Sequence, residues 1–273
     1  MDAAVIQNIL SYGPAFLLIA ARALAMIETA PLLSSDAIPQ AAKLALAGFA
    51  AYAVFPQAAA SAIGTGQFDA YGLSFVFLII GEGIIGIIIG FFLTIIFSAF
   101  STAGQFFSLQ MGFGASETFD PLSQIENPLL GQYLNLVAML VFLSTGGFRE
   151  LFLGGFWRSV ESINIVSLVE GREQTLGMFL SGLSRLFLDA MIISMPILGT
   201  LFLTSLATGL ISKAAPQINI LSEGFPISIT VAFLLIFAAL PFMTEAFARV
   251  VDAGFAGVET LYTRIGRPIG GTP

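Results

Sequence analysis

The sequence predicts an all-α, polytopic helical membrane protein with long kinked helices and hairpins. Hydrophobic residues make up 57% of its 273 positions and charged residues only 10%, whereas a soluble domain is typically about 25% charged. The apolar residues form runs long enough to cross a hydrocarbon core about 30 Å thick. Lipid offers no hydrogen-bond partner to the backbone and the alternating pattern of a barrel is absent from the sequence, so the runs are expected to be helices.

Six apolar runs follow one another along the chain, and each is predicted to cross the membrane. They are residues Ile9–Leu33, Ala42–Ile63, Leu73–Phe100, Leu129–Phe148, Leu176–Ile211 and Phe225–Val251. Pro196 lies inside the fifth run and should kink that helix. The longest connection, Arg149–Gln174, is charged and mildly amphipathic, so an interfacial segment and a plain loop are both open interpretations of it.

The basic residues predict that both termini lie in the cytoplasm. With six spans, Lys43 and Lys213 fall on one side of the membrane, and six arginines share the other side with the N-terminus. These arginines are Arg149, Arg158, Arg172, Arg249, Arg264 and Arg267. Because cytoplasmic loops carry the excess of basic residues, the arginine side is expected to be cytoplasmic.

The composition excludes most catalytic chemistry. Histidine and cysteine are both absent, which removes the commonest general base, thiolate nucleophiles and the usual zinc ligands. No phosphate-binding glycine loop or activated serine motif is present, and a net charge of −7 leaves no basic face for nucleic acid. We therefore predict no enzymatic activity, no cofactor and no metal. A small-solute secondary transporter is the main rival class, although the two halves show no convincing repeat.

Five charged residues lie inside the apolar runs: Arg22, Glu28, Glu82, Arg185 and Asp189. Each would cost about 2.5–3.5 kcal/mol at the centre of a lipid-facing helix, so they are expected to face protein or water. Arg185 and Asp189 stand four residues apart and can pair along one helix face, either as a proton or ion relay or as a structural pair. Glu82 has no partner in its own run, and a polar lumen and a cation from a neighbouring chain are both open.

The third run contains "GEGIIGIIIG", in which Gly86 and Gly90 form a GxxxG pair. Small residues at this spacing let two helix backbones approach closely. The pair therefore predicts dense packing of the third run against another helix.

Four segments resemble the FliR family of flagellar export-gate subunits, which has relatives in virulence type III secretion systems. They are "APLLSSDAIPQAAKLALAGFAAYAVFP", "MGFGASETFDPLSQIENPLLGQYLNLVAMLVFL", "STGGF" and "GLISKAAPQINILSEGFPISI". The likeness extends from about Ile9 to Val251. One departure is that Ser222 and Glu223 stand before Gly224-Phe225-Pro226, where the family usually has apolar residues, and this suggests a polar neighbour for that turn.

The resemblance implies a non-enzymatic subunit of a protein-conducting channel, placed in the bacterial inner membrane at the flagellar basal body. Its implied partners are FliP and FliQ homologues, FlhB and FlhA homologues, membrane lipid and unfolded export substrates in transit. It also implies a FliP-like part over residues 1–174, a FliQ-like helical hairpin over 175–251 and a short tail over 252–273. A homologous subunit of a virulence system is the alternative.

The family's loop between the third and fourth runs is understood to plug the channel, and the resemblance carries that role to Gln110–Pro128, "QMGFGASETFDPLSQIENP". Flexible apolar side chains suit a seal that excludes water and ions. The implied plug residues are Met111, Gly112, Phe113 and Gly114. The implied loop anchors are Phe119, Asp120, Pro121 and Pro128. The alternative is an ordinary extracytoplasmic turn.

Overall fold

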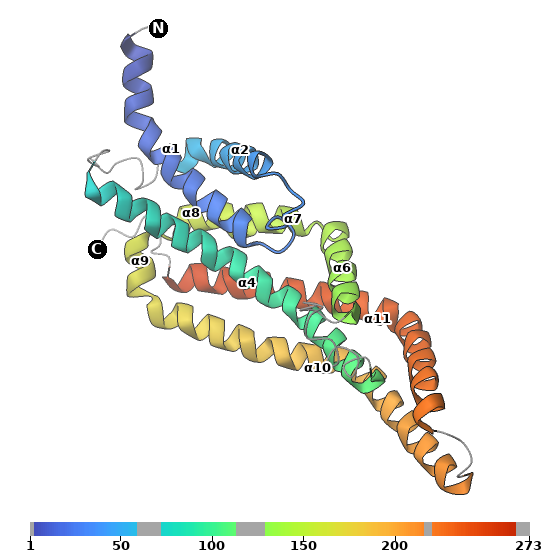
Figure 1. Ribbon diagram of the computed structural model, residues 1–273. Helices are drawn as coiled ribbons and strands as arrows, with labels where there is room; N and C mark the ends of the chain where they lie inside the picture. The colour runs from blue at the N-terminus through green and yellow to red at the C-terminus, as the bar shows by residue number, and fades with distance from the viewer. Residues whose placement is uncertain (1–2, 59–71, 113–128, 216–219, 266–273) are drawn as a thin grey trace. The chain divides into compact units, whose positions relative to one another are not determined.

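The computed structural model describes residues 3–58, 72–112, 129–215 and 220–265 (Figure 1). Over these ranges every regular element is a helix, which confirms the predicted all-α class. The elements are α1 (Ala3–Thr29), α2 (Gln40–Ala58), α4 (Leu73–Met111), α6 (Leu129–Ser144), α7 (Gly147–Arg149), η1 (Glu150–Trp157), α8 (Arg158–Ser162), α9 (Ile165–Glu170), α10 (Arg172–Ala214) and α11 (Ile220–Ile265).

Four helical segments within the described residues are long and apolar enough to cross a membrane. They are Tyr12–Thr29 of α1, the whole of α4, the whole of α10 and Pro226–Ile265 of α11. A fifth span results if α6 and the segment Gly147–Ser162 are counted as one broken helix. This confirms a polytopic membrane protein, and the described part of the chain holds four or five candidate spans where six were predicted over the whole chain.

The second predicted run, Ala42–Ile63, lies outside the described residues beyond Ala58, and its described part, helix α2, is not among the candidate spans. The sequence of α2 is rich in alanine and includes the polar residues Gln40, Lys43 and Gln57. The topology prediction rests on strict alternation over six spans and stays a prediction.

The structure corrects the loop interpretation of the connection Arg149–Gln174, whereas the interfacial interpretation stays a prediction. It is helical apart from a break at Ile163–Asn164 and the single residue Gly171. Its charged residues suggested a loop in the sequence, but several of its side chains are buried, including Leu151, Phe156 and Val160. Tertiary packing has therefore overridden the local signal.

The chain divides into two compact units, each assembled from separated stretches of sequence. Unit 1 contains Met1–Ile95, Gly146–Gly182 and Ala253–Pro273, and unit 2 contains Ile96–Thr145 and Leu183–Asp252. Helices α4, α10 and α11 each contribute one part to each unit.

In unit 1, α4 packs closely against α1 at the predicted GxxxG pair. A Cβ added to Gly86 would collide with the main-chain carbonyl of Arg22 and lie 3.0 Å from the Met26 nitrogen. A Cβ added to Gly90 would collide with the Thr29 hydroxyl and lie 2.8 Å from the Met26 carbonyl oxygen. The close approach predicted from Gly86 and Gly90 is confirmed, and the neighbouring helix is α1.

This contact predicts that Gly86→Ala destabilises unit 1 by about 1–3 kcal/mol, because the methyl group meets main-chain atoms that cannot move without shifting a helix. Gly83, one turn away on α4, has nothing within 4 Å of an added Cβ. Gly83→Ala is therefore the matched control and should be neutral or stabilising by up to about 1 kcal/mol, through helix propensity. Thermal unfolding of the two purified variants measures the difference. Equal melting temperatures would contradict the close packing.

In unit 2, phenylalanine rings fill the core between α4, α6 and α11. Phe97 lies 5.4 Å from both Phe142 and Phe247 between ring centroids, and Phe100 lies 4.5 Å from Phe247, all in edge-to-face arrangements. These geometries are favourable for aromatic pairs. At the other contact of α4 with α6, a Cβ added to Gly104 would lie 2.6 Å from the Gly131 backbone, so two glycines allow the helices to touch.

Candidate functional site

The centre of unit 1 holds a buried ion pair between α1 and α4. Nε of Arg22 lies 2.6 Å from Oε2 of Glu82, and the two side chains are 0% and 6% exposed. A charge at this depth is tolerated only where a partner and further hydrogen bonds satisfy it. The open question about Glu82 is therefore answered within the chain itself, because its cation is Arg22.

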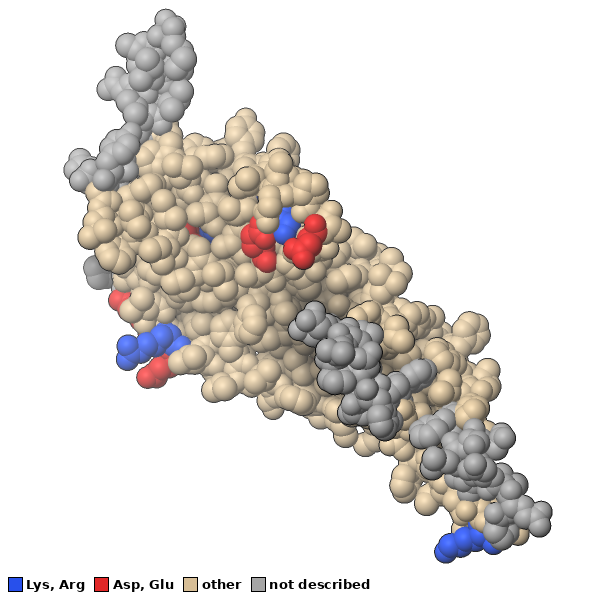
Figure 2. All heavy atoms as spheres, viewed as in Figure 1, with Lys and Arg blue, Asp and Glu red and all other residues tan. Residues whose placement is uncertain are grey.

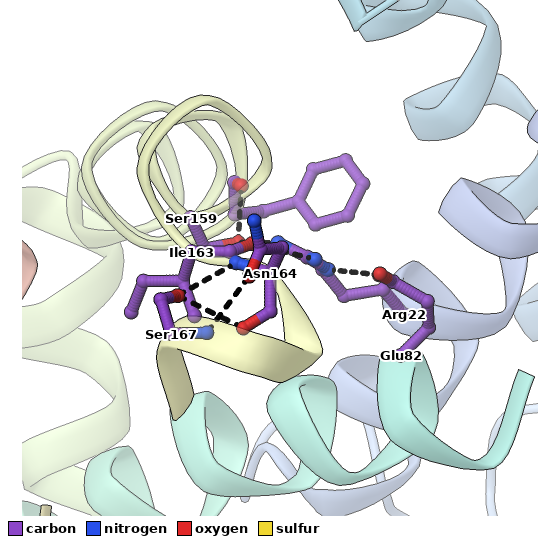
Figure 3. A network of polar contacts seen from close by, with 7 residues as sticks. Arg22, Glu82, Ser159, Ile163, Asn164 and Ser167 are labelled. Carbon is purple, nitrogen blue, oxygen red and sulfur yellow. Dashed lines mark hydrogen bonds and ion pairs between the residues drawn. The ribbon is translucent and has the colours of Figure 1, made fainter. Parts of the chain in front are cut away.

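The other donors of the Arg22 guanidinium reach the segment that follows η1 (Figure 3). Nη1 donates to the Ser159 hydroxyl at 3.2 Å, and Nη2 donates to the carbonyl oxygen of Ile163 at 3.0 Å. Ile163 is the residue at which α8 ends, so the cation also meets the negative end of a helix. One side chain thus links α1, α4 and α8.

The bend at Ile163 and Asn164, where Arg22 donates its hydrogen bond, is fixed locally by a capping box. Ile163 has an extended backbone, and Asn164 caps α9 by accepting a hydrogen bond from the Ser167 main-chain nitrogen at 2.8 Å. The main-chain nitrogen of Asn164 donates in return to the Ser167 hydroxyl at 3.0 Å. Such reciprocal bonds satisfy the free donors at a helix start. The Asn-x-x-Ser spacing is visible in the sequence and is the signal by which this bend could have been found.

A second ion pair in unit 1 involves Glu28, another of the predicted intramembrane charges. The Lys43 ammonium lies 3.0 Å from Oε2 of Glu28 and donates to the carbonyl oxygen of Ser34 at 3.1 Å. Lys43 is 2% exposed. It therefore contributes to the packing of the α1–α2 hairpin.

The remaining pair of predicted charges lies on the part of α10 that belongs to unit 2. Arg185 is exposed and Asp189 is half-buried, and among the described ion pairs within 4.0 Å none joins them. Their separation of four residues leaves a pair geometrically accessible. The relay and the structural pair both stay predictions.

The implied plug begins where α4 ends in unit 2. Met111 is the last residue of that helix and is 1% exposed, so in this structure its side chain belongs to the core of unit 2. Gly112 follows with φ of 85°, and its main-chain nitrogen donates to the Leu109 carbonyl at 3.2 Å. A residue in this left-handed conformation ends a helix, and glycine adopts it without steric cost.

The other implied loop residues lie outside the described residues. They are Phe113, Gly114, Phe119, Asp120, Pro121 and Pro128. The sealing role of the four plug residues and the anchoring role of the others stay predictions.

Sequence reasoning missed the contacts between the end of α11 and the η1–α8 segment in unit 1. The Tyr262 hydroxyl donates to the Gly155 carbonyl at 2.7 Å, and Arg158 forms an ion pair with Glu259. Both contacts join residues more than 100 positions apart, 107 for the first and 101 for the second. No local pattern in the sequence signals them.

Few charged side chains reach the surface that Figure 2 shows, and tan atoms of other residues cover most of its described part. The long helices are also incompletely covered within the chain, since only 44% of the most apolar 18-residue stretch of α4 is buried, and only 17% of the corresponding stretch of α11. Extensive uncovered apolar surface is expected of a protein whose surroundings are lipid or other apolar subunits.

Comparison with known proteins identifies the family. Residues 14–254 match the family model described as bacterial export proteins, family 1. The chain is 31% identical to the flagellar biosynthetic protein FliR of Escherichia coli K12 over 81% of this chain and 82% of the relative. It is 34% identical to FliR of Borreliella burgdorferi over 71% and 73%, and 29% identical to the surface presentation of antigens protein SpaR of Shigella flexneri over 59% and 61%. The chain therefore belongs to the bacterial export proteins, family 1, and is a membrane-embedded component of a flagellar or type III export apparatus.

Proposed function

We propose that this chain is the R subunit of a flagellar type III export gate, forming a protein-conducting channel together with FliP and FliQ homologues. The observation that carries the proposal is the family match over residues 14–254, together with FliR relatives that cover most of the chain. FlhB and FlhA homologues are the further proposed partners, with unfolded export substrates in transit. The proposed location is the bacterial inner membrane at the flagellar basal body.

The surface of α10 supports an assembled subunit over a chain surrounded only by lipid. Gly199 and Gly209 lie in the helix, are exposed, and have nothing within 4 Å of an added Cβ. A glycine inside a helix costs about 1 kcal/mol relative to alanine, and lipid offers no compensating contact. A helix from another subunit does so, because glycine lets the two backbones approach closely.

The finer proposals concern the division of the chain and its plug. We assign residues 1–174 to a FliP-like part, 175–251 to a FliQ-like hairpin and 252–273 to a tail. The segment Gln110–Pro128 is the plug that seals the idle channel. The end of α4 at Met111 and the positive φ of Gly112 support a helix stop near the start of this segment.

The family comprises export-apparatus components and is not an enzyme family. A homologous subunit of a virulence type III secretion system is the second candidate. The shorter and weaker match to SpaR than to the FliR proteins favours the flagellar assignment. A small-solute transporter is the least supported alternative.

The test is expression of this chain in a flagellated bacterium that lacks its own FliR. We expect restored motility and copurification of the chain with FliP and FliQ homologues. Restoration of secretion only in a bacterium lacking SpaR would support the virulence assignment instead. A stable monomer that binds a small solute and copurifies with neither homologue would contradict the proposal and favour a transporter.

A further inference from the structure

The segment Glu150–Trp157 of unit 1, η1, is a π-helix eight residues long. At its end the main-chain nitrogen of Arg158 donates to Leu153, five residues back, and also to Gly155. A π-helix has more residues per turn than an α-helix, and π-helical segments are rare and frequently occur at functional sites. If η1 changed to an α-helix by a shift of one residue in its hydrogen-bond register, the helix that follows it would rotate by roughly 100°, because an α-helix has 3.6 residues per turn.

Two side-chain hydroxyls bond main-chain carbonyls inside η1. The Tyr262 hydroxyl donates to the Gly155 carbonyl at 2.7 Å, and the Ser159 hydroxyl donates to the Phe156 carbonyl at 2.6 Å. Tyr262 is 5% exposed and Ser159 is 0% exposed. Buried carbonyls need donors, and a change of helix type disturbs the regular backbone ladder that normally supplies them.

The hydroxyls of Ser159 and Tyr262 connect η1 to different helices, and further contacts hold each of them in place. Ser159 accepts from Arg22, which is bound to Glu82, so one contact leads to α1 and α4 (Figure 3). Tyr262 lies near the end of α11, where Arg158 also pairs with Glu259. The π register is therefore bonded on one side to α1 and α4 and on the other to the last turns of α11.

We propose that η1 is a two-register helical segment, held in its π register by the Tyr262–Gly155 bond and the Glu82–Arg22–Ser159 chain, and that export requires the segment to change register. Conversion to an α-helix turns α8 and so carries Ser159 away from Arg22 and the Gly155 carbonyl away from Tyr262. Both contacts must break together. The register of η1 thereby couples the end of α11 to the α1–α4 pair.

Hydrogen–deuterium exchange of the full chain, copurified with its FliP and FliQ homologues, tests the first contact. Tyr262→Phe keeps the ring and removes the hydroxyl, and exchange in Glu150–Ser162 should accelerate about 2- to 10-fold, as expected for the loss of one hydrogen bond. Tyr133→Phe, at a tyrosine of α6 that is 44% exposed, is the control and should leave that segment unchanged. Unchanged exchange in Tyr262→Phe would overturn the proposal.

Deletion of Gly154 tests the register itself. Removing one residue from the π-helix should change its backbone hydrogen bonds from five-residue to four-residue spacing and keep the helices on both sides in place. The variant should therefore fold and show slower exchange in this segment. Deletion of Gly177 is the matched control, because it lies in the regular helix α10 and has nothing within 4 Å of an added Cβ, while Gly154 has only the Glu150 carboxylate at 3.4 Å. That deletion turns one flank of a helix and should reduce folding yield. A Gly154 deletion that folds as poorly as the Gly177 deletion, or exchanges as fast as the native chain, would overturn the register model.

The last measurement rests on the proposed function. The folded Gly154 deletion should assemble with its partners, yet it should not restore export in the flagellated bacterium that lacks its own FliR, because its helix register is fixed. Normal export by this variant would overturn the requirement for a register change. Failure of the unmodified chain to restore export would instead overturn the proposed function, and the exchange results would still decide whether η1 has two registers.

Discussion

Arg22→Ala is expected to destabilise unit 1 by about 3–5 kcal/mol, because it leaves the Glu82 carboxylate buried without a partner. The carboxylate is 6% exposed and its bond to Arg22 is 2.6 Å long. The same change removes the donors from the Ser159 hydroxyl and the Ile163 carbonyl. Thermal unfolding and the yield of folded protein should both fall sharply.

A double variant separates the loss of a partner from the loss of packing. Arg22→Met combined with Glu82→Leu removes both charges at similar volume, and such replacements of buried pairs are often neutral or stabilising. The double variant should therefore be more stable than Arg22→Ala. Arg249→Ala is the exposed control, since Arg249 and Glu245 are 59% and 71% exposed, and it should cost less than about 1 kcal/mol. Similar losses in Arg22→Ala and Arg249→Ala would contradict the role of the buried pair.

Deletion of residues 113–116 is expected to make cells that contain the assembled gate leak small ions. The change removes Phe113 and Gly114 of the proposed plug but leaves Met111 in the core of unit 2 and Gly112 at the end of α4. An apolar constriction holds back ions by excluding water, so its loss opens a hydrated path. Ion conductance of the assembled complex, measured in a planar bilayer, is the direct readout.

The control for the deletion replaces the same four residues with glycine and serine, which keeps the loop length and removes the phenylalanine side chain. Both variants should conduct if side chains form the seal. Conductance in the deletion alone would show that loop length matters more than the phenylalanine. Wild-type conductance in both variants, with normal assembly, would contradict the plug.

Met111 illustrates how the structure refines a sequence interpretation. The sequence and the family resemblance made it a flexible sealing residue, whereas the structure buries its side chain to 1% exposure at the end of α4. Truncation of a buried methionine costs about 2–5 kcal/mol. Met111→Ala is therefore expected to act on stability as well as on any seal, and Phe113 is the cleaner residue with which to test sealing alone.

The close approach of α4 to α1 could be predicted in part. Glycine spacing identified Gly86 and Gly90 as a contact surface, because the absence of a side chain is a property of the residue itself. The helix that fills the space could not be predicted, since the atoms nearest to Gly86 belong to Arg22, Ala25 and Met26 of a different run.

The amino-acid sequence by itself determined that this chain is helical, membrane-embedded and a member of an export family. These properties follow from apolar run length, from the low content of charge and from short motifs, all of which are local. The tertiary structure alone decided that Glu82 is paired with Arg22, that Lys43 is buried and that the charged segment after Arg149 is a helix. Arg22 lies 60 positions from Glu82 and 137 from Ser159. The physical reason is that the burial of a charge depends on atoms brought together by packing, and no local pattern of residues specifies which distant atoms those are.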